Sequence, residues 1–350
     1  MKDKDNRQLA IWLYTGAFCI FIQIILGGIT RLTGSGLSIT EWQPLLGFLP
    51  PMNIAAWQHS FEQYQQIAQF KVINSQFILA DYQSIFFWEW LHRNWARMLG
   101  FIFLIPFIFF VIKKKLTRNL FIQLSILFCL GLLQAIIGWL MVKSGLNDTA
   151  VRVDDLRLAV HFIAAVILLC YTLWMAFGLS IIVKPVDSSP IPKNIAGITF
   201  ALLLLQLFYG ALMAGSHAAL TAPTWPDING YLIPPELMHP IPGSANTYLL
   251  TIQFIHRLIA YMIFILVLIM YSKTSGWKLN RVLSRFRLLP LILVVIQVVL
   301  GIVTLLNSFN PRYRYYALLH QCTGLLLLSS VLLVFYTITI RVPFKKTDHS

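Results

Sequence analysis

The sequence predicts an all-α polytopic membrane protein whose eight transmembrane helices form two pseudo-symmetric four-helix bundles. Its 350 residues are 58% hydrophobic and only 11% charged, with a mean hydropathy of +0.72, which excludes an ordinary soluble domain. Apolar runs of about 20 residues, long enough to cross the hydrocarbon core of a bilayer, recur along the chain. We expect spans at residues 9–29, 92–112, 120–142, 158–183, 195–215, 251–271, 288–307 and 317–340.

The basic residues indicate the orientation of the chain in the lipid bilayer. The net charge of +14 would suit a nucleic acid, but most lysines and arginines lie in short loops on one side of the apolar runs, so no nucleic-acid partner is expected. By the positive-inside rule, that side and both termini are cytoplasmic. The first apolar run lacks a small-x-small cleavage site, so it is expected to remain as an anchor. Since no Arg- and Ser-rich transit peptide precedes it, the sequence favours the cytoplasmic (inner) membrane of a bacterium.

The first segment expected on the outer side, residues 30–91, is long. It contains an amphipathic stretch, 54–70, in which Trp57, Phe61 and Tyr64 recur at helical spacing. That pattern is typical of a helix lying in the membrane interface.

A Pro- and Ser-rich linker at 184–194 divides the chain near its middle. We therefore expect an N-terminal four-helix half, 1–183, and a C-terminal four-helix half, 195–350. The second half contains the other long outer segment, 216–250, which is rich in proline and carries no Lys or Arg.

The two halves repeat one pattern of polar residues. A Gln-x3-Gly pair occurs in each odd span, and a histidine, with a small residue four positions later, begins each even span. The pairs are Gln23/Gly27, Gln134/Gly138, Gln206/Gly210 and Gln297/Gly301, and the histidines are His92, His161, His256 and His320, followed by Ala96, Ala165, Ala260 and Gly324. Because both halves start on the cytoplasmic side, the repeats are parallel and related by an axis along the membrane normal.

The four repeated histidines favour haem as the bound group. Two imidazoles from each half could face each other near the outer side, and helical bundles build cofactor sites from facing side chains. Paired neutral imidazoles suit haem iron, whereas zinc or copper would need further ligands. The sequence contains no CxxCH motif, so covalent attachment of haem is not expected. We expect the other histidines to be surface residues, with His217 the strongest exception: His59, His217, His239 and His349.

One position distinguishes the halves. Glu89, three residues before His92, is matched by Gln253, three residues before His256. An acid in the first turn of a helix would complement the helix dipole, but this would serve either half equally. A carboxylate beside a haem-sized pocket can act as a general base or stabilise a developing cation. The first half is therefore predicted to be catalytic and the second to be a fixed cofactor site.

Four arginines near the outer side are candidate contacts for haem propionates. The alternative is ordinary snorkelling of long cationic side chains at the membrane interface. They are Arg93, Arg97, Arg157 and Arg257.

With these motifs in place, the sequence resembles the haem A synthase family over nearly its whole length. The resemblance rests on the segments Gly27–Ser38 (GGITRLTGSGLS), Thr40–Pro44 (TEWQP), Glu89–Arg93 (EWLHR), Asp154–His161 (DDLRLAVH), His256-Arg257 and Leu319–Gln321 (LHQ). It implies two pseudo-symmetric four-helix bundles and oxidation of the C8 methyl of haem O to a formyl group, giving haem A for terminal oxidases.

The resemblance also implies a role for each site residue. Haem B would be held by His256 and His320, and the substrate haem O would lie between His92 and His161 near the periplasmic face. Glu89 would be essential, either by stabilising a carbocation at the methyl carbon or by assisting water or proton transfer. An electron acceptor and the prenyltransferase that forms haem O are implied partners. The oligomeric state is left open.

Some members of this family carry a cysteine pair in the first outer segment. Residues 30–91 contain no cysteine, so the chain resembles the proteobacterial and mitochondrial type. A mechanism that uses loop thiols is not expected here.

Three other functions share some of these sequence features. A non-catalytic dihaem cytochrome b electron carrier would share the histidines but would not need Glu89. A transporter of parallel repeats would bind near the midplane in broken helices, whereas the polar groups here cluster at the outer side. A haem O-forming prenyltransferase would need Asp-rich inner loops. The only acidic residue in the inner loops between spans is Asp187.

Overall fold

The computed structural model describes residues 3–41, 47–147, 149–181, 193–274 and 281–339. Within these ranges every regular element is a helix, apart from one isolated β-bridge between Ile228 and Tyr231. Eight helical stretches of the described chain are long and apolar enough to cross a membrane. The predicted all-α polytopic fold with eight spans is therefore confirmed.

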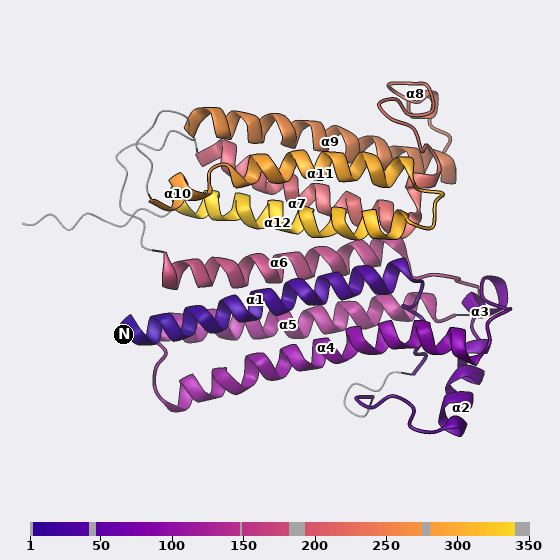
Figure 1. The fold of residues 1–350 in the computed structure, drawn as a ribbon, viewed down its shortest axis with the longest axis horizontal. Coiled ribbons are helices and arrows are strands. Elements are labelled where there is room, and N and C mark those ends of the chain that lie inside the picture. Colours follow the sequence, from indigo (N-terminus) through magenta and orange to yellow (C-terminus); the bar gives the residue numbers. More distant parts are fainter. Residues whose placement is uncertain (1–2, 42–46, 148, 182–192, 275–280, 340–350) are drawn as a thin grey trace, which may run out of the picture. The chain divides into compact units, whose positions relative to one another are not determined.

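The spans are formed by long helices that run nearly parallel to one another within each half of the chain (Figure 1). They are α1 (Asp3–Leu32), α4 (Leu79–Ile112), α5 (Arg118–Gly145), α6 (Asp155–Ser180), α7 (Lys193–Ser216), α9 (Ala245–Thr274), α11 (Leu289–Leu306) and α12 (Tyr313–Thr339). The short helix α10 (Arg281–Phe286) precedes α11 and continues the same span, Val282–Leu306.

The even spans begin earlier than predicted. Helix α4 starts at Leu79 and α9 at Ala245, well before His92 and His256. The expectation that the histidines lie in the first turn of their helices is therefore wrong. A hydropathy pattern detects only the part of a helix that lies in hydrocarbon, and these two helices extend beyond their most apolar stretch.

The chain divides into two compact units. Unit 1 comprises Thr15–Leu169 together with Ala214–Ser216, and unit 2 contains Lys2–Tyr14, Cys170–Met213 and the chain from His217 onward. The predicted linker, 184–194, lies almost entirely outside the described residues, so the division of the chain at that point remains a prediction.

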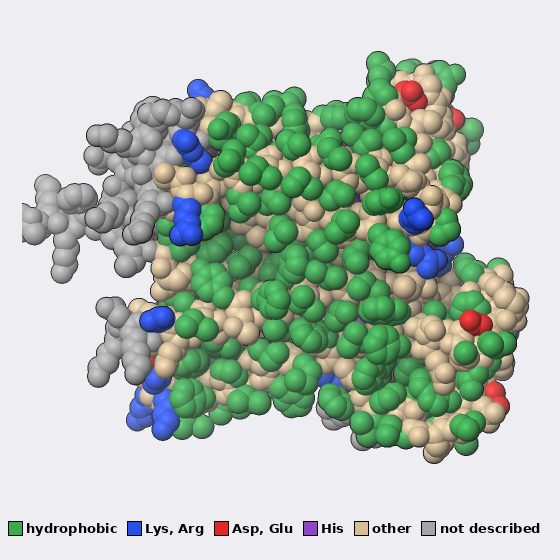
Figure 2. Space-filling view, viewed as in Figure 1, with side chains coloured by type: hydrophobic (Ala, Val, Ile, Leu, Met, Phe, Trp, Pro, Cys, Tyr) green, Lys and Arg blue, Asp and Glu red, His purple; other side chains and the backbone are tan. Residues whose placement is uncertain are grey.

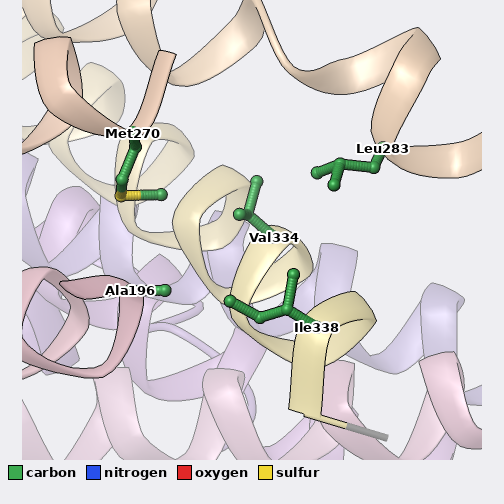
Figure 3. Packing of buried hydrophobic residues seen from close by; sticks show 5 residues of the cluster. All are labelled: Ala196, Met270, Leu283, Val334 and Ile338. Atoms are coloured by element: carbon green, nitrogen blue, oxygen red, sulfur yellow. The ribbon is translucent and has the colours of Figure 1, made fainter. Parts of the chain in front are cut away.

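One core of unit 2 is an apolar cluster drawn from four helices. Met270 of α9, Leu283 of α10 and Val334 of α12 are 4%, 4% and 3% exposed, and Ala196 of α7 is fully buried beside them. Figure 3 shows Val334 and Ile338, one helical turn apart on α12, pointing toward the side chains of the neighbouring helices. The C-terminal helix therefore packs in the interior of its unit.

Hydrophobic side chains dominate the visible face of both units, whereas Lys, Arg, Asp and Glu lie near the helix ends (Figure 2). Helix α4 has only 6% of its most apolar window buried, against 67% for α12. Its outward residues Phe101, Ile105 and Ile108 are 54%, 66% and 52% exposed. An apolar surface of this kind is stable only in lipid, which agrees with a multi-pass membrane protein.

The amphipathic stretch at residues 54–70 forms two short helices instead of one. It forms α2 (Ile54–Gln65) and α3 (Ala68–Val72), with a break at residues 66–67. The aromatic face of α2 packs on the outer part of α4, where Trp57 lies 4.9 Å from Phe86 and Tyr64 lies 5.3 Å from Tyr82 between ring centroids. Protein therefore covers this aromatic face, and the position of the stretch in the membrane interface stays a prediction.

Candidate functional site

Each repeated histidine lies against the Gln-x3-Gly pair of the span before it. The glutamine amide nitrogen is within hydrogen-bond distance of an imidazole nitrogen in all four places. The separations are 3.3 Å for Gln23–His92, 3.2 Å for Gln134–His161, 3.2 Å for Gln206–His256 and 3.3 Å for Gln297–His320. The two sequence motifs therefore form one structural unit, repeated twice in each half of the chain.

The glycine of each pair makes room for the imidazole ring. A Cβ atom built on Gly27, Gly138, Gly210 or Gly301 would lie 3.1, 2.7, 3.3 or 2.9 Å from Cε1 of the facing histidine. Contacts below about 3 Å are closer than van der Waals packing permits. A side chain at Gly138 or Gly301 would therefore clash with the imidazole, whereas one at Gly27 or Gly210 would need the ring to move by a few tenths of an ångström.

The glutamines differ between the units in a second hydrogen bond. In unit 1, the amides of Gln23 and Gln134 also donate to the backbone carbonyls of His92 and His161, at 3.2 and 3.0 Å. In unit 2, the amides of Gln206 and Gln297 have the imidazole as their hydrogen-bond partner. In all four glutamines the carbonyl oxygen Oε1 is buried without a hydrogen-bond partner.

The donor set fits an iron porphyrin. All four histidines are partly exposed residues. Nδ1 of His256 is buried without a hydrogen-bond partner, and Nδ1 of His320 lies 3.1 Å from the carbonyl of Gln297. Among the described residues no group of three or more His, Cys, Asp or Glu side chains is placed to hold a metal ion. Imidazole pairs without further ligands suit haem rather than a bare cation.

Glu89 is almost fully buried, with 3% of its surface exposed. Its Oε1 forms a 2.6 Å salt bridge with Arg93, and its Oε2 accepts hydrogen bonds from the Ser38 hydroxyl at 2.7 Å and the Ile39 N–H at 2.9 Å. Because α4 begins at Leu79, Glu89 lies in the helix interior, so the helix-dipole explanation of this acid is wrong. The carboxylate instead ties α4 to the segment that follows α1.

That segment is the Gly-rich motif of the sequence, and it is buried. Ser35, Leu37 and Ser38 are 0%, 2% and 1% exposed. Gly34 has φ = +71°, a left-handed conformation in which only glycine avoids strain. The Tyr82 hydroxyl donates to the Ser38 carbonyl at 3.2 Å. The Gly-rich motif is therefore a buried, hydrogen-bonded segment that packs beside Glu89.

Unit 2 contains the counterpart of this arrangement with its hydrogen-bond polarity reversed. Gln253 is fully buried, and its amide donates to the carbonyl of Ala222 at 2.9 Å. Arg257 donates to the carbonyls of Ala222, Thr224 and Asp227 at 3.2, 2.8 and 2.7 Å. A glutamine that donates to a loop carbonyl has thus replaced a carboxylate that accepts from a loop N–H.

The four candidate propionate arginines all have acceptors within the protein. Arg93 donates to the carbonyls of Ile39 and Glu41 as well as to Glu89, Arg97 donates to the Asn94 side chain, and Arg157 donates to the Leu140 carbonyl. Arg93 and Arg257 therefore hold the outer loops against α4 and α9. Contact of any of the four with a propionate stays a prediction.

Tyr64 forms a small hydrogen-bond network near the Gly-rich segment. The Tyr64 hydroxyl donates to Gln69 at 3.1 Å and accepts from the Asn74 amide at 2.7 Å. Burial raises the pKa of Tyr64, the hydrogen bond from Asn74 opposes this, and the nearby charge of Glu89 adds to the increase. Tyr64 therefore stays protonated and acts as a hydrogen-bond donor.

Residues 10–332 match the COX15-CtaA family, described as "Cytochrome oxidase assembly protein". The chain belongs to this family. Its curated relatives named "Heme A synthase" include a Flavobacterium psychrophilum protein, 38% identical over 93% of this chain and 97% of the relative. A Brucella suis protein is 40% identical over 93% and 90%, and one from Bartonella bacilliformis is 36% identical over 94% and 91%.

Within this member of the COX15-CtaA family, the three other histidines that the structure describes lie where the sequence predicted. His59 and His239 are exposed, His217 is partly buried at the end of α7, and His349 lies outside the described residues. The contacts of the four glutamines with the imidazoles, and of Ser38 with Glu89, were not predicted from the sequence. Their signal was the equal Gln-to-Gly spacing in four spans, which marked a repeat but did not reveal its partner.

Proposed function

We propose that the chain is a haem A synthase, which oxidises the C8 methyl of haem O to a formyl group by successive hydroxylations and loss of water. The single observation that carries this proposal lies in unit 1. There the imidazoles of His92 and His161 pack against Gly27 and Gly138, and the buried carboxylate of Glu89 lies three residues before His92. The names of the relatives support it. In this proposal His92 and His161 bind the substrate haem, and His256 and His320 bind haem B.

The haems would supply the iron and the conjugated ring on which oxidation occurs, and the chain supplies position and charge. The glycines of the Gln-x3-Gly pairs have no side chain, so the imidazoles can approach the helices that carry them. Glu89 is oriented by three donors, from Ser38, Ile39 and Arg93, so its carboxylate has little freedom to turn. A negative charge fixed in this way can stabilise positive charge at a neighbouring carbon or take up a proton.

The asymmetry between the units supports the assignment of chemistry to unit 1. Gln253 in unit 2 carries no charge and points its amide at a loop carbonyl, so it cannot serve as a base. The methyl group loses electrons in the reaction, and an electron acceptor is therefore a required partner. The prenyltransferase that makes haem O is a partner by analogy alone.

The location proposed is the bacterial cytoplasmic membrane, with both termini cytoplasmic and the haem sites near the periplasmic face. The distribution of basic loop residues supports this orientation. With no cysteine in residues 30–91, we place the chain with the members that lack loop thiols.

The test is chromatography of the haems extracted from the purified protein, expressed with and without a source of haem O. With haem O we expect haem B plus haem A or its hydroxylated precursor, and without it haem B alone. The matched variants His92→Ala and His256→Ala should lose the substrate haem and haem B respectively. Haem B in both units, with no haem O product, would instead identify a dihaem electron carrier.

A further inference from the structure

The second long outer loop, residues 216–250, has an apolar surface that the proposed reaction does not use. Its charged side chains are Asp227 and Glu236, and it contains no Lys or Arg. Five large apolar side chains between the β-bridge and α9 are nevertheless exposed: Tyr231, Leu232, Ile233, Met238 and Ile241. An exposed apolar patch of this kind marks a contact with a membrane or with another protein.

The loop is folded against the flank of its own unit. Leu237 of the short helix α8 (Pro235–Met238) packs with Phe254 of α9 against a buried cluster of Ala222, Ile228 and Leu250. Figure 1 shows the loop and α8 beside the outer turns of α9 instead of beyond the end of that helix. The exposed side chains of the loop therefore lie at the depth of the first turns of a membrane span.

The apolar surface of the loop adjoins an apolar surface of α9. Leu258, Tyr261 and Ile265 of that helix are exposed, on a span that is apolar enough to cross a membrane. Tyr248, in the first turn of α9, and Trp225 of the loop are exposed as well, and Tyr and Trp favour the headgroup level of a bilayer. The loop thus extends a surface that lipid covers, with interfacial aromatic residues beside it.

The backbone of the segment suits a poorly hydrated place. Pro234, Pro235, Pro240 and Pro242 have no N–H group that needs a partner. The N–H groups of Leu237, His239 and Ser244 donate to carbonyls of the same segment at 3.0, 3.0 and 3.1 Å. Because an unsatisfied backbone donor is costly in hydrocarbon, a segment with few free donors can enter a bilayer more readily than an ordinary loop.

We propose that residues 231–241 form a membrane-interfacial element that inserts into the leaflet beside the first turns of α9, which is the outer leaflet in the orientation proposed above. Phospholipid acyl chains cover Leu232 and Ile241, and the headgroups lie near Trp225 and Tyr248. A protein partner on this flank of α9 would have to displace lipid. Interfacial anchors set the tilt and depth of a span, so the element fixes α9 in the bilayer whatever reaction the chain performs.

The experiment measures the surroundings of the loop in the full-length protein, reconstituted in nanodiscs of phosphatidylethanolamine and phosphatidylglycerol. A nitroxide is attached to Leu232→Cys or Ile241→Cys in a chain whose native cysteines are replaced by alanine. Leu232 and Ile241 are 83% and 66% exposed, so these two changes leave the packing of the loop intact. The control is Arg312→Cys, an exposed position between α11 and α12 of the same unit.

Power saturation then compares collisions of each nitroxide with oxygen, which concentrates in lipid, and with nickel–EDDA, which stays in water. The oxygen-to-nickel collision ratio is expected to be several-fold higher at residues 232 and 241 than at residue 312. Equal ratios at the three positions would show that the patch faces water and would overturn the proposal. Few collisions with either reagent at residues 232 and 241 would show that protein covers the patch, which would overturn it too.

A second measurement uses the wild-type chain and does not depend on the folding of the cysteine variants. The nanodiscs contain a phospholipid with a photoreactive diazirine on its acyl chain, and the adducts are located by mass spectrometry after illumination. Adducts are expected within residues 231–241 as well as on the exposed side of α9. Adducts on α9 with none on residues 231–241 would contradict the insertion of the loop.

Discussion

The hydroxyl of Ser38 donates a 2.7 Å hydrogen bond to the carboxylate of Glu89. This bond joins the Gly-rich segment after α1 to the middle of α4, and the Ile39 N–H and Arg93 complete the same carboxylate shell. Glu89 therefore has a structural partner for each oxygen besides its proposed role in the reaction. Any test of Glu89 must separate the two.

Ser38→Ala is predicted to separate position from chemistry. It removes one donor to a buried carboxylate, which costs on the order of 1.5–3 kcal/mol, but it leaves the charge of Glu89 in place. We expect slower formation of haem A with unchanged binding of haem O, measured by haem chromatography over time after addition of haem O. Complete loss of product in Ser38→Ala would indicate that Glu89 serves mainly to anchor the loop.

Replacing the glycines that face the imidazoles by alanine should destabilise the protein more where less space is available for the added Cβ atom. A Cβ on Gly138 would lie 2.7 Å from the His161 ring, whereas one on Gly210 would lie 3.3 Å from the His256 ring. Overpacking of a fixed contact costs about 1–3 kcal/mol, so Gly138→Ala should lower the melting temperature in detergent clearly more than Gly210→Ala. Equal effects would contradict the idea that the ring positions are fixed.

Arg257→Leu is predicted to loosen the second outer loop. The guanidinium donates to three loop carbonyls, those of Ala222, Thr224 and Asp227. Hydrogen bonds to charged groups are worth about 1.5–3 kcal/mol each, so protease cleavage within residues 221–231 should become faster. A variant that loses haem B while its loop resists protease as before would instead favour a propionate contact.

The same loop should respond to acid through Asp227. The Gly230 N–H, followed by the Thr224 hydroxyl, holds the pKa of Asp227 below its ordinary value of 3.8. A carboxyl whose pKa is lower in the folded state stabilises the fold above its unfolded pKa, and this contribution is lost as the pH falls through the folded value. Hydrogen exchange of the Gly230 amide should therefore speed up, relative to the intrinsic rate, below about pH 4. In Asp227→Asn this step should be absent, and a step retained there would assign it to another group.

The sequence was sufficient to place the eight spans and to single out the four repeated histidines, and the reason is physical. A membrane span is specified locally by about 20 apolar residues, so α5 and α7 were placed within a few residues. The histidines stood out because a polar ring in an apolar helix needs a partner or a ligand. Both signals are read from one stretch of chain at a time.

What the sequence did not reveal depends on contacts between distant segments. The start of α4 at Leu79 is supported by packing against α2, and the hydrogen bond of Glu89 to Ser38 spans a loop whose path is set by Gly34 and buried Leu37. The role of Gln23 depends on which ring faces it. Such pairings are fixed by the tertiary fold, and a repeated spacing such as Gln-x3-Gly does not say which side chain each residue will contact.

The most direct test of the account is the haem content of Glu89→Ala compared with Gln253→Ala, both supplied with haem O and analysed by chromatography with mass detection. The account predicts that Glu89→Ala holds haem B with unreacted haem O, whereas Gln253→Ala still forms haem A or its hydroxylated precursor. Haem A in Glu89→Ala at the wild-type level would contradict it, because the chemistry would then not depend on the carboxylate that distinguishes the two halves.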